Sequence, residues 1–434
     1  MQFIVKLYFF GNTNLKSKSL LLQRKINSTD MKDKVMDITE DVKWIGILDP
    51  DLVTFDVVME TKYGTTYNSY FIDAEKKVII DTSKEKYWSD YLLKIDEVCN
   101  PEDIDYIVVN HTEPDHSGNL KNLLRLAPQA TVVGSGNAIR YLRDLMGMDF
   151  EYLVVKDGHT LSLGNKTLRF ISAPNLHWPD TIYTYLEEEK VLFTCDSFGA
   201  HFCDNKLFEE EIERRDEYDE SFKYYFDVIL KPYSKFMLKA IQKIEGLDIK
   251  TICPGHGPVL RKNWKKIVDQ SKELSEEALA EPERPRVFIP YVSAYQKTGM
   301  VAKLIAEGIQ QAGDIDVDVC DIEMSPMGEL EEKITHASAY IIGSPTINQN
   351  ILFPIYKCFA LINPIRDKGK LAAAFGSFGW SGEAKKLITD NLTNLKLKVF
   401  DDGMFVKFTP NEEDSDAALA FGKAFGAELL SYNN

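Results

Sequence analysis

Short apolar runs separated by turn residues dominate the first 260 residues, which is the pattern of β-strands rather than of long helices. An early run, Trp44–Leu48, is expected to form one strand. Later runs at Tyr106–Val109, Val191–Thr194 and Lys250–Cys253 each lead into a polar loop. Between the last two, a charged stretch from Glu209 to Ile244 is expected to be helical. We therefore expect a sheet system whose strands carry functional loops at one end.

The pattern changes after Ala278–Pro285, a segment with two prolines and alternating charge that is typical of a domain boundary. Beyond it, strand, loop and helix alternate, and helices are expected up to Ala312 and over Ala417–Tyr432. The expected strands are Arg286–Tyr291, Val317–Ile322, Ala339–Ile342, Leu371–Phe375 and Leu395–Val399. This alternation predicts an α/β unit, a doubly wound parallel sheet of about 150 residues.

Composition narrows the class of protein. A chain of 434 residues with 44% hydrophobic content holds about two or three folded domains. The net charge of −16 argues against nucleic acid as a partner. The acid-rich run Glu209–Glu220 is expected to be a solvated face. No apolar run approaches the ~18 residues of a membrane helix. The six cysteines include no C-x-x-C pair, which favours reduced thiols inside a cell.

The first 30 residues differ from the rest, because they carry Lys and Arg but no acidic residue before Asp30. Such a leader resembles an organelle transit peptide. A disordered tail and a true start at Met31 are the alternatives. We expect a cytoplasmic protein, with a mitochondrion-related organelle as the alternative.

One hexapeptide concentrates candidate chemistry, because four potential metal ligands fall within six residues directly after a predicted strand. These ligands are His111, Glu113, Asp115 and His116. A single small ion cannot easily use all four side chains, so the density of ligands indicates two metal ions.

Three further loops add His177, Asp196 and His256, each close behind a predicted strand. The remaining histidines, His159, His201 and His336, are interpreted as core or surface residues. Four imidazoles and three carboxylates without a thiolate suit iron or manganese, and zinc less exclusively. Two ions ~3.5–4 Å apart, bridged by one carboxylate, are a usual arrangement for two-metal catalysis.

The loop Ser293–Thr298, at the start of a predicted helix, has hydroxyls at both ends and suits a phosphate monoester. It is neither a Walker loop nor G-x-G-x-x-G, which disfavours nucleoside triphosphates and NAD. Two further loops at the same sheet edge carry Asn348, Phe378 and Trp380, which suit an isoalloxazine ring. A response-regulator-like sheet without a cofactor is the alternative, and the glycine and aromatic content of the last loop argues against it.

The spacing of the candidate ligands resembles that of the flavodiiron proteins, also called A-type flavoproteins. His111-x-Glu113-x-Asp115-His116 is followed by His177 after 60 residues, Asp196 after 18 and His256 after 59. The resemblance covers residues from about 31 to 434. It implies a metallo-β-lactamase-like αββα sandwich over 31–280 and a flavodoxin-like FMN-binding domain over 285–434. Hydrolases of that superfamily have His where Glu113 stands.

By the same resemblance, one iron would be held by His111, Glu113 and His177, and the other by Asp115, His116 and His256, with Asp196 bridging them. The positions that resemble the family's FMN loops are Ser293, Ala294, Tyr295, Gln296, Lys297, Thr298, Pro345, Thr346, Asn348, Ser377, Phe378, Gly379, Trp380 and Gly382.

The family reduces O2 to water, NO to nitrous oxide, or both, and we lean towards O2 here. The resemblance also implies an obligate homodimer, or a dimer of dimers, in which the FMN of one subunit lies near the iron site of the other. No rubredoxin-like cysteine pairs are present, so an external donor is expected: rubredoxin, ferredoxin or a flavoprotein reductase. The alternatives are a two-zinc hydrolase with a regulatory flavodoxin domain, and an electron-transfer module with a vestigial metal site.

Overall fold

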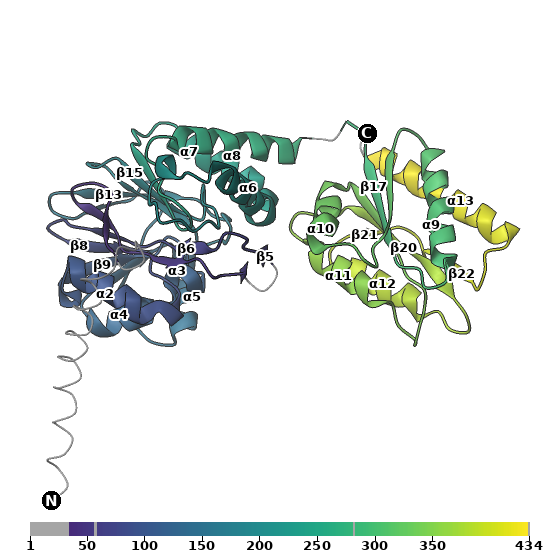
Figure 1. Ribbon diagram of the computed structural model, residues 1–434, viewed down its shortest axis with the longest axis horizontal. Coiled ribbons are helices and arrows are strands. Elements are labelled where there is room, and N and C mark those ends of the chain that lie inside the picture. Colours follow the sequence, from purple (N-terminus) through teal and green to yellow (C-terminus); the bar gives the residue numbers. More distant parts are fainter. Residues whose placement is uncertain (1–33, 56–58, 281–282, 433–434) are drawn as a thin grey trace, which may run out of the picture. The chain divides into compact units, whose positions relative to one another are not determined.

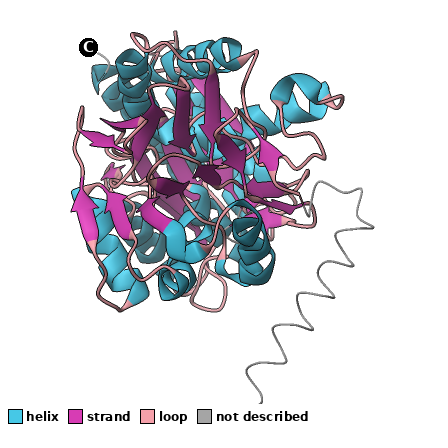
Figure 2. Cartoon of the chain, turned by 90° about the vertical axis from the view of Figure 1, so that its left-hand side faces the viewer, coloured by secondary structure: helices cyan, strands magenta, loops and turns pink. Residues whose placement is uncertain are grey.

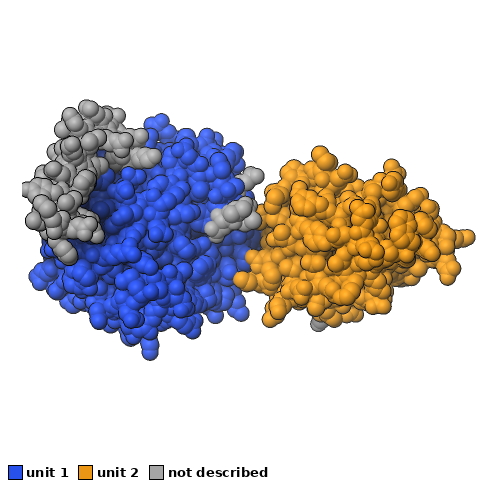
Figure 3. All heavy atoms as spheres, turned by 90° about the horizontal axis from the view of Figure 1, so that it is seen from below, with its two compact units in different colours: residues 1–280 blue, residues 281–434 orange. Residues whose placement is uncertain are grey.

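The chain divides into two compact units, residues 1–280 and 281–434 (Figure 3). The residues that the computed structural model describes are 34–55, 59–280 and 283–432. The basic leader lies outside them, and its interpretation stays a prediction. Within these ranges no helix combines the length and apolarity needed to cross a membrane. All six cysteines are free thiols.

Unit 1 is built on two β-sheets. The larger sheet has the order β1 (Met36–Asp37), β2 (Val42–Trp44), β7 (Tyr70–Ile72), β8 (Lys77–Ile80), β9 (Ile104–Val108), β10 (Thr131–Gly134) and β11 (Tyr152–Val154). The smaller sheet has the order β12 (Thr160–Ser162), β13 (Thr167–Ser172), β14 (Ile182–Leu186), β15 (Val191–Cys195) and β16 (Thr251–Pro254). From β8 to β11 the larger sheet is parallel, and β15 and β16 are parallel neighbours in the smaller one.

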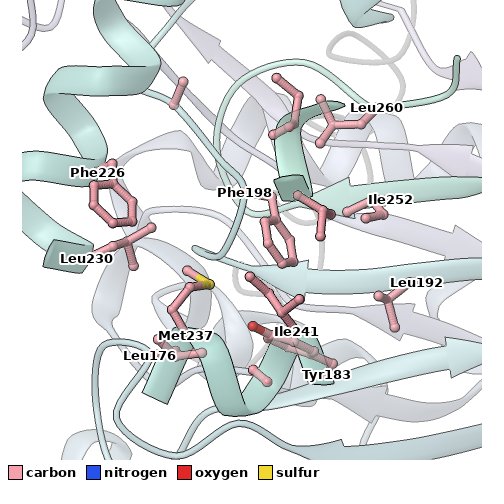
Figure 4. Packing of buried hydrophobic residues seen from close by; sticks show 14 of the residues in the cluster. Leu176, Tyr183, Leu192, Phe198, Phe226, Leu230, Met237, Ile241, Ile252 and Leu260 are labelled. Atoms are coloured by element: carbon pink, nitrogen blue, oxygen red, sulfur yellow. The ribbon is translucent and has the colours of Figure 1, made fainter. Parts of the chain in front are cut away.

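Alternating side chains along the strands create three apolar layers. In β8, Val78 and Ile80 join the core between the sheets, whereas Ile79 faces the helices. The helices on that outer face are α2 (Trp88–Val98), α4 (Leu120–Leu126) and α5 (Gly136–Met146). The helices on the outer face of the smaller sheet are α6 (Arg215–Tyr225), α7 (Ser234–Ile244) and α8 (Trp264–Leu279). Unit 1 is therefore an αββα sandwich, with sheets between helices in Figure 2 and the second helical core in Figure 4.

The expectation of one strand over Trp44–Leu48 is wrong. Strand β2 ends at Trp44, and a separate strand β3 (Ile47–Asp49) pairs with β6 (Thr65–Tyr67) in a small sheet of its own. A second small pair joins β4 (Thr54–Phe55) and β5 (Met59–Glu60). The chain changes partner at Gly46, where a Cβ atom would lie 2.6 Å from the Tyr67 carbonyl oxygen.

The predicted helical region Glu209–Ile244 is broken into pieces. A 3-10 turn at Glu209–Glu211 precedes α6, and a π-helical turn (Phe226–Leu230) and a second 3-10 turn (Lys231–Tyr233) separate α6 from α7. Proline at 232 has no backbone N–H to donate, which favours a break there. The solvated-face expectation also fails at Glu209, which is buried and accepts hydrogen bonds from Arg215 and Asn263.

Unit 2 is a parallel sheet with helices on both faces. The strand order is β18 (Asp316–Asp321), β17 (Arg286–Tyr291), β19 (Ala339–Gly343), β20 (Leu371–Phe378) and β21 (Lys398–Val399), with β22 (Met404–Lys407) also on β20. One face packs against α9 (Lys297–Gln310) and α13 (Glu412–Tyr432) (Figure 1). The other packs against α10 (Met327–His336), α11 (Phe353–Leu361) and α12 (Glu383–Asn394). The strand predicted over Leu395–Val399 is too long, because α12 ends at Asn394 and β21 begins only at Lys398.

Candidate metal centre and cofactor loops

Four strand ends of unit 1 converge on one cluster of seven side chains. The loop after β9 continues into the short helix α3 (Pro114–Ser117) and carries four of them. The loop between β13 and β14 carries His177, Asp196 directly follows β15, and His256 lies just beyond β16. Because Cys195 and Pro254 are aligned in neighbouring parallel strands, Asp196 and His256 leave the sheet at the same edge.

Glycines flank His256 because the chain approaches itself closely there. A Cβ atom on Gly255 would lie 2.7 Å from Cε1 of His116. Gly257 has a φ of +76°, and its Cβ would lie 2.7 Å from the Ala200 carbonyl oxygen. Any side chain at Gly255 would therefore displace His116 or the backbone of β15.

The seven side chains form two sets. The first contains His111, Glu113, His177 and Asp196, and its candidate ligand atoms lie within 4.8 Å of one another. The second contains Asp115, His116 and His256, under the same limit. Glu113 Oε2 lies 2.9 Å from His177 Nε2 and 3.2 Å from His111 Nε2. In the second set, Asp115 Oδ2 lies 3.1 Å from His256 Nε2.

Asp196 faces both sets with different oxygens. Its Oδ2 lies 3.5 Å from Nε2 of both His111 and His177. Its Oδ1 lies 3.0 Å from Nε2 of His116 and 3.6 Å from Nε2 of His256. A carboxylate that presents one oxygen to each set has the geometry of a bridging ligand.

Several oxygens of this cluster are buried without a hydrogen bond. Within the described residues, both carboxylate oxygens of Asp115 and Oδ2 of Asp196 make no hydrogen bond, although imidazole nitrogens lie 3.1 Å from Asp115 Oδ2 and 3.5 Å from Asp196 Oδ2. Buried acceptors without donors are costly in a folded protein unless a cation satisfies them. The residues present therefore fit metal ions, and the mixed imidazole and carboxylate donors fit iron.

The charges of the cluster stabilise one another. Burial disfavours an ionised Asp196, but the neighbouring His116 outweighs it and holds the Asp196 pKa well below its usual range. Burial likewise opposes charge on His116, yet Asp115 and Asp196 raise its pKa to about 9. Metal binding to such a cluster releases protons, because metal ions bind the neutral imidazole and not the protonated one.

Aromatic rings enclose the second set. His201, interpreted from the sequence as a core or surface residue, is buried, with its ring centroid 4.9 Å from that of His256. Phe55 and Tyr225 pack on His201 at 4.6 Å and 4.8 Å between ring centroids. His201 belongs to neither set of candidate ligands.

Sequence reasoning missed Asp180, a buried carboxylate next to His111. Its Oδ2 lies 3.2 Å from His111 Nδ1 and accepts a hydrogen bond from the Thr112 amide at 2.7 Å. The available signal was its place three residues after His177, in a loop already assigned to the site.

In unit 2, the three predicted cofactor segments lie at the carboxyl ends of the adjacent parallel strands β17, β19 and β20. Strand β20 is longer than predicted, so Ser377 and Phe378 are its last two residues and not part of a loop. Ser293 Oγ accepts a hydrogen bond from the Gly299 amide, so it lies at the beginning of α9. The hydroxyls of Thr298 and Ser377 are buried and lie 3.0 Å apart. By contrast, Tyr295 and Trp380 are 81% and 91% exposed. The hydroxyls are therefore gathered inside and the aromatic rings outside.

The remaining cofactor-loop residues lie on the same loops. Thr346 Oγ1 accepts from the Ala384 amide, and its own amide donates to the Ser377 carbonyl, which joins the second and third loops. Gln296 and Asn348 adopt positive φ angles of 63° and 53°, where each loop turns sharply. Gly382 is the N-cap of α12.

Two family models match this chain, one for each unit. The ODP family beta lactamase model matches residues 65–257, and the flavodoxin model matches residues 289–422. The flavo-diiron protein FprA2 of Clostridium acetobutylicum is 40% identical over 397 residues, which cover 90% of this chain and 99% of that protein. The nitric oxide reductase of Moorella thermoacetica is 32% identical and covers 90% and 98%.

A solved structure matches this chain across both of its units. The rubredoxin oxygen:oxidoreductase of Desulfovibrio gigas has a TM-score of 0.71 and 29% identity, over 92% of this chain and 99% of that one. Both the metallo-β-lactamase-like and the flavodoxin-like domains expected from the sequence are thereby confirmed.

Proposed function

The chain belongs to the flavodiiron protein family, and we propose that it reduces O2 to water as its main reaction, with NO reduction to nitrous oxide as a second activity. It is an oxidoreductase with FMN and two iron ions as cofactors. The observation that carries this proposal is Asp196, whose two oxygens face two separate ligand sets. We assign the iron-binding domain to residues 31–280 and the FMN-binding domain to residues 285–434.

In this proposal His111, Glu113 and His177 would hold one iron, and Asp115, His116 and His256 would hold the other. Asp196 would serve both, since it presents one oxygen to each group of histidines. When bound, the two ferrous ions and the reduced FMN supply four electrons, which is the number that O2 requires to become two waters. The protein's own contribution is to keep the ligands fixed and water away from them. Phe55 and Tyr225 contribute to that exclusion, since their rings lie 5.7 Å and 6.1 Å from the ring of His256.

For FMN, the hydroxyls of Ser293, Thr298 and Ser377 and the amides at the start of α9 suit the phosphate, because helix N-termini favour anions. The exposed rings of Tyr295 and Trp380 are available for stacking with the isoalloxazine. The remaining loop residues supply backbone amides and shape: Ala294, Gln296, Lys297, Pro345, Thr346, Asn348, Phe378, Gly379 and Gly382.

Partners follow from the same proposal. An external protein donates electrons to FMN, and rubredoxin is favoured because the similar Desulfovibrio gigas enzyme is named for it. A homodimer is proposed, and the exposed side chains of Tyr295 and Trp380 on the cofactor loops of unit 2 support it as surface that a partner can cover. Free cysteines support a reducing compartment such as the cytoplasm.

The test is gas consumption by the iron-loaded, FMN-loaded protein, with O2 and NO presented separately under one artificial donor. Fast O2 uptake with slow NO uptake is expected, and the reverse would make NO the main substrate. Glu113→Ala is expected to lose iron and gas reduction but to keep FMN. Full turnover by that variant, or two zinc ions and no iron in the active protein, would refute the assignment and favour the two-zinc hydrolase.

A further inference from the structure

Asp180 is a fully buried carboxylate that belongs to neither ligand set but contacts the first. Its Oδ2 accepts a hydrogen bond from the Thr112 amide at 2.7 Å and lies 3.2 Å from His111 Nδ1. Because this oxygen already accepts from the Thr112 amide, it faces His111 as an acceptor, and the hydrogen between them is placed on His111 Nδ1.

The scaffold holds Asp180 independently of the candidate ligands. Ser135, the N-cap of α5, donates its hydroxyl to the Asp180 carbonyl at 2.7 Å. In the same helix, Asn137 donates to the Pro179 carbonyl at 3.1 Å. The loop that carries His177 is therefore tied to α5, and the carboxylate is aimed at His111 by contacts outside the cluster.

The second set has a different support. His256 Nδ1 lies 2.6 Å from the Thr66 carbonyl oxygen, which is a neutral acceptor. His116 Nδ1 is buried and has no hydrogen-bond partner in the described part of the chain. Among the four imidazoles, His111 is the one with a carboxylate from outside the two sets within 4 Å, as far as the described residues show. The two sets thus differ in the groups that contact the other ring nitrogen of their histidines: a carboxylate contacts His111, whereas a neutral carbonyl contacts His256.

We propose that Asp180 is a positioning residue for the first iron: it fixes His111 with the proton on Nδ1, so that the Nε2 lone pair faces the metal beside Glu113 and His177. This inference rests on the proposed function. A carboxylate behind a ligating imidazole also raises its basicity, and losing such a partner typically weakens metal binding ~10–100-fold. The effect is expected at one of the two ions, because the hydrogen bonds and the ion pair of the Asp180 carboxylate in the described structure go to His111 and Thr112 and not to the second set.

The experiment is an anaerobic Co²⁺ titration of the full-length protein after chelation, followed by visible absorption. Wild type is expected to bind two Co²⁺ per chain, and Glu113→Ala identifies the step that belongs to the first set. Asp180→Asn is expected to weaken that step ~10-fold and Asp180→Ala up to ~100-fold, with the other step unchanged.

Two control variants separate positioning from general damage. Asp157→Asn removes an exposed carboxylate that accepts from the Ser172 amide beside the same loop, and it should leave both steps unchanged. Ser135→Ala removes the tether to the Asp180 backbone but keeps the carboxylate. Ser135→Ala should weaken Co²⁺ binding at the first ligand set less than Asp180→Ala does.

The outcomes are distinguishable. Unchanged binding in Asp180→Ala, or an equal loss at both steps together with a lower melting temperature of the chelated protein, overturns the positioning role. Failure of the wild type to bind two ions overturns the proposed function, and the inference with it.

Discussion

The two candidate sites use burial in opposite ways. In unit 1, six of the seven candidate ligands are buried, and only His177 keeps a side chain that is 20% exposed. In unit 2, Thr298 is buried while Trp380 is 91% exposed, although both belong to the same set of cofactor loops. Unit 1 therefore buries nearly all of its candidate metal ligands, whereas unit 2 buries hydroxyl groups of its candidate cofactor site and leaves an aromatic ring exposed.

The difference follows from the size of what each site has to hold. A metal ion is stabilised by groups that contact it directly, so a single unit can enclose it, and buried charges there stabilise one another. A flavin presents a small charged phosphate and a large flat ring, and only the phosphate needs a fixed polar cradle. The ligands of the candidate metal site in unit 1 therefore depend on one another electrostatically. In unit 2, contacts with the phosphate and contacts with the ring can be changed independently.

Removing Asp196, the proposed bridging carboxylate, should give the largest effect. Asp196→Ala leaves both ligand sets incomplete, so we expect both iron ions to be lost and gas reduction to fall more than ~100-fold, at least ~2.7 kcal/mol. Flavin per chain should stay unchanged, since unit 2 is untouched. Metal and flavin analysis on the same preparation checks this. Asp248→Ala, at an exposed carboxylate paired with Lys190, is the matched control. Loss of flavin from Asp196→Ala would contradict the independence of the two candidate sites.

Next in size is the effect of pH on the chelated protein. His116 has its pKa raised to about 9, above the ordinary ~6.5, so its ion pairs stabilise the folded state fully below pH ~6.5. That stability is lost as pH rises through about 9, and the pKa difference corresponds to about 3 kcal/mol. Urea unfolding at several pH values between 6 and 10 measures it. His116→Gln should flatten the profile, and a wild-type protein that gains stability over this range would contradict the charge arrangement.

A smaller and separate effect is expected from the two hydroxyls of the first cofactor loop on FMN binding. Thr298→Val and Ser293→Ala would each remove a proposed hydrogen bond to the charged phosphate, worth ~1.5–3 kcal/mol, or roughly 10–150-fold in FMN affinity. Flavin fluorescence titration of the apoprotein measures the loss. Iron content should not change. If both variants bind FMN as tightly as wild type, this loop is not the phosphate site.

The smallest expected effect belongs to the exposed ring. Trp380→Ala should reduce FMN affinity by only ~0.5–1.5 kcal/mol, the usual worth of aromatic stacking. The same titration measures it, with Trp380→Phe as the variant that retains a ring. A loss larger than that of Thr298→Val would show that the ring, not the phosphate, dominates binding.

Much of this molecule follows from local sequence. The strands before the ligand loops were predicted closely, since β9 spans Ile104–Val108 and β15 spans Val191–Cys195. Such short apolar runs bounded by polar residues have one stable local outcome. The run at Trp44–Leu48 was misjudged because its local pattern does not reveal that two different strands pair with its two halves.

The sequence alone determined which residue types lie at the strand ends and how they are spaced. That spacing carried the resemblance to the family, and the resemblance implied the two proposed ligand sets. The tertiary structure decided which side chains from other loops contact those residues. The carboxylate of Asp180 reaches His111 from 69 positions away, and the ring of His201 reaches His256 from 55. Such contacts depend on how loops of different strands are tied together, and no local pattern of polarity encodes that. The exposure of Trp380 is likewise decided by which segments pack against its loop, and the local sequence does not show that.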